Sequence, residues 1–199
     1  MVWLIEDAEI VAEIEKQNDR GACLVATAFL DNQLYLTLGF VLEDQEKVRN
    51  KLFKGSGPLA TFSAKIDLGY MLAMYPDYMH SALHTVRRIR NEFAHSAKPI
   101  TFETQQIRDL CGNLFPPHTH ERFQLSFKEA MAVLTASSDQ LNIETKNRIL
   151  TDAIMGGEDT PRTRFLNSVR SILLHLHLIV VCARLRNVQM RLEPKLTYW

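Results

Sequence analysis

Apolar residues recur every three to four positions along most of the chain, which is the spacing of one face of an α-helix. Residues 22–42 are apolar on most sides and follow Asp19, a residue type that often caps helices, so we expect a central core helix there. Gly57-Pro58 separates two later helical segments. The pattern predicts helices over residues 6–16, 22–42, 43–53, 59–74, 77–95, 105–110, 121–134 and 163–192.

Two of the predicted helices, 59–74 and 77–95, have a distinct apolar face. In the first, Lys65 and Asp67 are expected to lie away from that face. The expected buried positions are Phe62, Ile66, Leu68, Gly69 and Leu72 in the first helix and Leu83, Val86, Ile89, Phe93 and Ala94 in the second.

The domain organisation follows from breakers and composition. Residues 163–192 contain no breaker and predict a long C-terminal helix, which needs packing support at that length. The polar stretch 135–162 predicts a mobile connection before it. With 199 residues but only 8 glycines and 7 prolines, the chain lacks the turn residues of a β-sandwich. We predict an all-α helical bundle with additional helices, forming a single domain over residues 1–199.

The net charge is zero, from 23 Lys+Arg and 23 Asp+Glu. Proteins that grip duplex nucleic acid over a broad surface normally carry a basic excess, and no helix-turn-helix signature is present, so sequence-specific DNA binding is not expected. The charge is uneven, because residues 1–19 carry six acids and one base whereas residues 160–199 carry seven bases and one acid. We expect the two ends to pack together or on a partner, and the alternative interpretation is a nucleic-acid-binding arm.

Three widely spaced cysteines, Cys23, Cys111 and Cys182, lie among apolar neighbours and are expected to be reduced thiols rather than disulfides. The acidic N-terminus is too briefly apolar for a signal peptide. The longest apolar run, 172–183, is shorter than the ~20 residues of a membrane span. We therefore expect a cytoplasmic protein that does not enter a membrane.

The stretch Arg90-Asn91-Glu92-Phe93-Ala94-His95 carries the residue types of a catalytic site. Each helical residue turns by about 100°, so Asn91 and His95 stack one turn apart with Arg90 beside them, and all three can point into one cleft. Arginine clamps phosphates, and histidine moves protons at neutral pH. In the alternative interpretation, Arg90 bridges an acid such as Glu92, and His95 interacts with the C-terminal end of its own helix.

Neighbouring cations extend this segment. Arg87 and Arg88 form a phosphate-attracting cluster with Arg90, and Lys98 adds to it, although such a triplet is also typical of a solvated helix face.

The histidines outside this segment include one pair with the spacing of metal ligands. His80 and His84 are one turn apart with Asp77 nearby, but no HExxH glutamate and no cysteine pair accompany them. We expect surface or interface histidines, no metal and no cofactor. His175 and His177 are expected to serve packing or hydrogen bonds between helices.

The run Arg90-Asn91-x-x-Ala94-His95 resembles the Arg-x4-His signature of the HEPN superfamily. That resemblance implies a small helical bundle, commonly dimeric, whose nuclease members join the motifs of two subunits into a metal-independent RNA-cleaving site. For this chain it implies a homodimer and an endoribonuclease hypothesis of toxin or antiviral type. Arg90 would bind the scissile phosphate, His95 would be general acid or base, and Asn91 would position one of them.

The stretch Gly57-Pro58-Leu59-x-x-Phe62-Ser63-x-Lys65-Ile66-Asp67-Leu68-x-Tyr70-x-Leu72 resembles the mannitol operon repressor family, bacterial helical regulators that lack a recognisable DNA-reading motif. Together the two resemblances cover residues 34–102. They favour, as the leading hypothesis, a bacterial regulatory protein that acts on transcription through contacts with a protein partner. In the alternative hypothesis, the endoribonuclease, the partner is RNA.

Overall fold

The computed structural model describes residues 13–14, 16–42, 45–114 and 159–192, and every regular element within them is a helix. The all-α prediction is therefore confirmed for the described residues. The predicted helix 121–134 lies outside them, as do most of 6–16 and most of the connection 135–162, and the single-domain prediction stays a prediction. The helices are α2 (Asp19–Val41), α3 (Glu46–Phe53), α4 (Phe62–Met71), α5 (Asp77–His95), α6 (Gln105–Gly112) and α9 (Pro161–Leu192).

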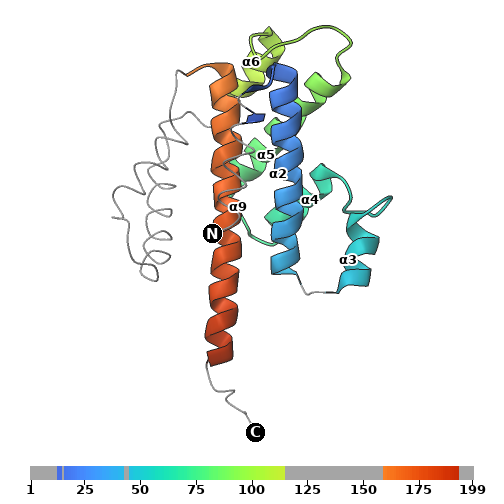
Figure 1. The fold of residues 1–199 in the computed structure, drawn as a ribbon, viewed down its shortest axis with the longest axis vertical. Helices are drawn as coiled ribbons and strands as arrows, with labels where there is room; N and C mark the ends of the chain where they lie inside the picture. Colours follow the sequence, from blue (N-terminus) through green and yellow to red (C-terminus); the bar gives the residue numbers. More distant parts are fainter. Residues whose placement is uncertain (1–12, 15, 43–44, 115–158, 193–199) are drawn as a thin grey trace, which may run out of the picture.

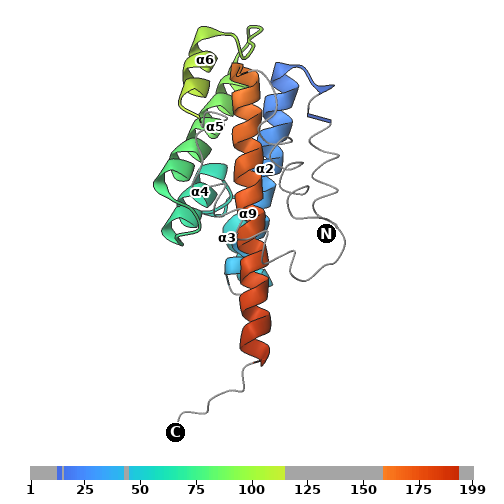
Figure 2. The same cartoon turned by 90° about the vertical axis from the view of Figure 1, so that its left-hand side faces the viewer.

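Two long helices, α2 and α9, lie side by side along the bundle (Figure 1). α5 packs against both, while α4 contacts α2 and α5, and α6 contacts α5 and α9. With 32 residues α9 is about 48 Å long, and its C-terminal end runs past the other helices (Figure 2). The largest fully buried side chains include Leu30, Leu34 and Leu38 of α2, Leu83, Ile89 and Phe93 of α5, and Phe165 and Ile172 of α9.

Within the described residues one helix, α2, is long and apolar enough to cross a membrane by length and composition. Its packing against α4, α5 and α9 accounts for this apolar character, because these contacts place it in the core. The expected central core helix is thus present.

The start of α2 differs from the prediction. Asn18, not Asp19, is the cap, because the Asn18 side chain accepts a hydrogen bond from the Gly21 amide at 2.8 Å. Asp19 lies in the first turn and accepts from the Phe102 amide (2.9 Å) and from Arg162 (2.5 Å). The Arg162 pair joins the acidic N-terminal region to the basic C-terminal region, as expected from their charges.

The start of α4 also differs, because Gly57 to Ala60 form turns and the helix begins at Phe62. Thr61 is the cap, accepting from the Ala64 amide at 3.2 Å. Lys65, expected to lie away from the core, is buried and pairs with Asp31 of α2 at 2.5 Å. The ion pair allows this charged side chain to lie between two helices.

Two residues expected to be buried are exposed. Leu72 is the first residue after α4, and Ala94 lies beyond the last buried position of α5, Phe93. Both residues lie at the C-terminal end of a helix, where the apolar periodicity of the sequence continues past the last buried position.

Candidate functional site

A hollow of about 560 Å³ opens between α2, the start of α4 and the C-terminal half of α5. The lining residues are Leu24, Thr27, Ala28 and Asp31 of α2, Thr61, Phe62 and Ser63 at the start of α4, and Arg87, Arg90 and Asn91 of α5.

Helical spacing explains which α5 residues meet there. Arg87, Arg90 and Asn91 are three and four positions apart and therefore share one face. The Arg90 Nη1 donates to the Asn91 Oδ1 at 3.1 Å. The structure thus brings together the guanidinium and the amide of the candidate catalytic stretch.

The other candidate residues of this stretch do not line the hollow. His95 is the last residue of α5 and is exposed. Arg88 is turned about 100° from Arg87 and is exposed as well. Lys98 follows the helix and is exposed, and its backbone carbonyl accepts from Arg20 at 3.2 Å. The candidate phosphate-binding set is therefore split, with Arg87 and Arg90 in the hollow.

The hollow is electropositive. It contains two guanidinium groups, and the Nε of Arg87 is buried without a hydrogen-bond partner. The one carboxylate in the lining, Asp31, is paired with Lys65. The first turn of α4 adds amide groups without intrahelical acceptors and the positive end of the helix dipole. Such a site can hold an anion, and a phosphate group fits this chemistry.

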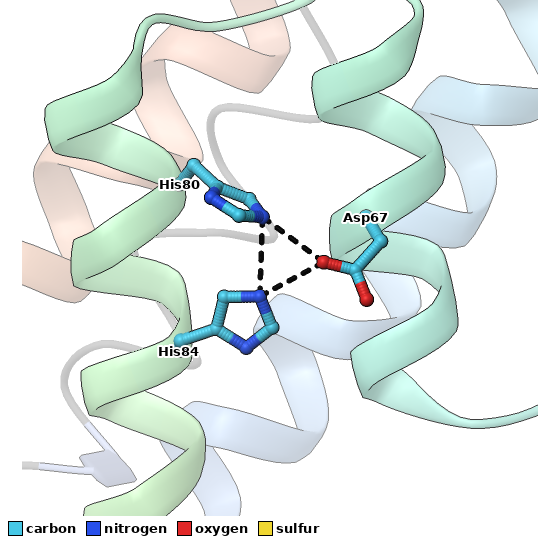
Figure 3. Close-up of side chains that lie close together, drawn as sticks. All are labelled: Asp67, His80 and His84. Carbon is cyan, nitrogen blue, oxygen red and sulfur yellow. Dashed lines mark hydrogen bonds and ion pairs between the residues drawn. The ribbon is translucent and has the colours of Figure 1, made fainter.

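A second cluster lies between α4 and α5, where Asp67 faces His80 and His84 (Figure 3). The Asp67 Oδ1 is 3.0 Å from the Nε2 of each histidine, and the two Nε2 atoms are 3.1 Å apart. Hydrogen bonds from His80, and then from His84, lower the pKa of Asp67 against the opposing effect of burial. These atoms could together hold a metal ion.

The acid beside the two histidines is Asp67, not Asp77 as the sequence suggested. Asp77 accepts a hydrogen bond from the Tyr70 hydroxyl at 2.6 Å, while Asp67 reaches the histidines from α4. The one-turn spacing of His80 and His84 is a signal in the sequence. No comparable signal selects Asp67, because its position depends on how α4 packs against α5.

The sequence matches no protein-family model and no curated protein. Two solved structures resemble the whole bundle at 14% sequence identity. One is a chain of the X-ray structure of the MtlR-HPr complex from Escherichia coli, with a TM-score of 0.55 over 85% of this chain and 96% of that one. The chain has an MtlR-like fold.

The other is the crystal structure of a possible transcriptional regulator, YggD, from Shigella flexneri 2a str. 2457T, with a TM-score of 0.56 over 85% of this chain and 97% of that one. At this identity the likeness to MtlR and YggD establishes the fold alone. The resemblance to the mannitol operon repressor family is thus confirmed at the level of fold. The HEPN resemblance stays a prediction.

Proposed function

We propose that this chain is a bacterial regulatory protein that acts by binding another protein rather than by reading DNA. The proposal rests on the MtlR-like fold, which the chain shares over nearly the whole length of its two neighbours. One neighbour belongs to a complex of two proteins, MtlR and HPr, and the other is described as a possible transcriptional regulator. The zero net charge also favours protein contacts over duplex DNA.

We take as the candidate contact surface the exposed apolar side chains at the end of α4 and the start of α5, and we call this set the apolar patch: Tyr70, Met71, Leu72 and Tyr78. All four side chains are exposed, and Met71 is 81% exposed. The hydrogen bond from Tyr70 to Asp77 ties the end of α4 to the start of α5 and so keeps the patch together. Methionine and aromatic side chains are enriched at the centres of protein interfaces.

The test is isothermal titration calorimetry of the full chain with the HPr protein of the same bacterium. We expect saturable binding by the wild type and at least about tenfold weaker binding by Met71→Asp, because a carboxylate in an apolar contact costs more than the 1.4 kcal/mol that a tenfold change represents. Val48→Asp is the control, because Val48 is 54% exposed on α3, away from the patch. Failure of the wild type to bind HPr would refute this partner. Equal binding by both variants would refute the patch.

We further propose that the protein is a cytoplasmic homodimer. The HEPN-like motif on α5 supports the dimer, because in that superfamily two copies of the motif meet. Sedimentation equilibrium of the full chain should give twice the 22.8 kDa chain mass, and a mass of one chain would contradict the proposal.

The endoribonuclease is the second candidate function, and it is favoured by the Arg90–Asn91 pair at an electropositive hollow. His95 lies outside that hollow, so cleavage would require a two-subunit site in which His95 meets Arg90 of the other copy. Total RNA is incubated with wild type and with His95→Ala in the presence of a chelator. Cleavage by the wild type alone would establish the enzyme, whereas intact RNA with both proteins would exclude it.

A further inference from the structure

We propose that Asp67, His80 and His84 bind a divalent first-row transition-metal ion, with Zn²⁺ as the best-matched example. Two imidazole nitrogens and one carboxylate oxygen suit zinc, and they also suit iron, cobalt or nickel in the divalent state. The proposal is independent of the regulatory function above.

The three donor atoms have the spacing of ligands around one ion. They form a triangle with sides of 3.0, 3.0 and 3.1 Å (Figure 3). Metal–ligand bonds of about 2.1 Å that meet at angles between 90° and 109° separate neighbouring donors by roughly 3.0–3.4 Å. A single ion above this triangle can therefore touch all three atoms with very small side-chain movements.

Protons alone satisfy this triangle poorly. If both Nε2 atoms carry hydrogens, both can donate to the Asp67 oxygen, but the two N–H dipoles then lie side by side on nitrogens 3.1 Å apart. If only one Nε2 atom carries a hydrogen, that hydrogen can point well at only one of the other two atoms. The lone pairs of the second Nε2 atom and of the Asp67 oxygen then face each other. If neither does, three sets of lone pairs converge without a cation. A metal ion satisfies all three donors at once.

The framework holds the ligands in place before any ion arrives. The His80 ring stacks on Tyr70, with ring centroids 4.3 Å apart and an interplanar angle of 19°. Tyr70 is in turn held by Asp77. On the inner side of α4, the carbonyl of Ile66 accepts from the buried hydroxyl of Tyr75 at 2.6 Å. Support of this kind reduces the cost of ordering the ligands when metal binds.

The site is open to solvent. The side chains of His80 and His84 are 25% and 26% exposed, and that of Asp67 is 58% exposed. An ion can enter directly, and water or a partner's ligand can occupy its remaining positions. Three protein ligands with open positions are typical of reactive or exchangeable sites rather than of closed structural zinc sites.

The test is calorimetric titration of the chelator-treated full chain with Zn²⁺, with helical circular dichroism recorded for every variant. We expect one ion per chain for the wild type. In His84→Ala and Asp67→Asn the affinity of this site should fall by at least about 100-fold, the upper end of the loss caused by removing even an outer-shell partner. His95→Ala is the control on the same helix. The double variant His118→Ala/His120→Ala controls for the histidines beyond the described residues. Both should bind as the wild type does.

A second measurement uses Co²⁺, whose visible d–d absorption changes in position and intensity when protein ligands replace water around the ion. The wild type and the two controls should show this change, and the ligand variants should not. Asp67→Asn preserves the shape of an exposed side chain and decides the matter if an alanine variant loses helicity. Absence of zinc binding by the wild type, or wild-type affinity in both His84→Ala and Asp67→Asn, would overturn the proposal and leave a hydrogen-bonded surface cluster.

Discussion

A Cβ atom at Gly69 would lie 2.5 Å from the hydroxyl oxygen of Tyr75 and 2.9 Å from two carbons of its ring. Tyr75 is buried and bonded to the Ile66 carbonyl, so it cannot move aside freely. We expect Gly69→Ala to lower the free energy of unfolding by about 1–3 kcal/mol, as overpacking does. Gly112→Ala is the matched control, because nothing lies within 4 Å of its Cβ and alanine favours helices. Urea unfolding measures both, and a Gly69→Ala protein as stable as the control would contradict this contact.

We expect the free energy of unfolding to depend on pH because of the His175 side chain. Burial lowers its pKa from the ordinary 6.5, although its hydrogen bond with the Met74 carbonyl (3.0 Å) acts in the opposite direction. The folded state therefore binds fewer protons at this site than the unfolded state, and stability is lost as the pH falls below 6.5.

Urea unfolding at about pH 7.5 and about pH 5 should show a smaller loss for His175→Gln than for the wild type, because glutamine does not titrate. Equal losses in the two proteins would show that other groups cause the decline. The contact with Met74 also confirms that His175 serves a hydrogen bond between α9 and another part of the bundle.

At the level of helices, the start of α2 is the junction at which distant segments meet. Asp19 binds both the Phe102 amide before α6 and Arg162 in the first turn of α9, whereas the Asn18 side chain caps its own helix. We expect Asp19→Ala to cost about 2–3 kcal/mol, because two charge-assisted bonds are lost, and Asn18→Ala to cost about 1 kcal/mol. Chemical unfolding measures the free energy of unfolding of both variants. An equal or larger loss in Asn18→Ala would show that the contacts of Asp19 with distant segments add no stability.

At the scale of the whole bundle, the reactivity of the three cysteine thiols shows which of them the packed core covers. Cys23 and Cys111 are buried, and burial raises the pKa of Cys23 and raises that of Cys111 to about 12, whereas Cys182 on α9 is exposed. A thiol reagent such as Ellman's reagent should label one cysteine rapidly in the native protein and all three in denaturant, since thiolates react and buried thiols do not. Cys182→Ser should abolish the rapid phase. Rapid labelling of all three native cysteines would contradict the packed core.

Helix α5 shows which features of the fold could be predicted from the local sequence. Its bounds, Asp77–His95, coincide with the predicted segment, because the 3.6-residue periodicity and the breakers on either side are properties of the local chain. Four of its five expected buried residues are buried, and the long helix of residues 163–192 begins only two residues earlier than expected, at Pro161. The helical class and the position of Arg90 beside Asn91 were likewise predicted from spacing alone.

Contacts between helices could not be read in this way. Asp67 rather than Asp77 faces His80 and His84, Lys65 is buried because Asp31 lies opposite, and His95 lies outside the hollow. Each of these outcomes depends on the distance and rotation of one helix relative to another. Those quantities are set by side-chain interdigitation across residues far apart in the chain, and a local periodicity carries no information about them.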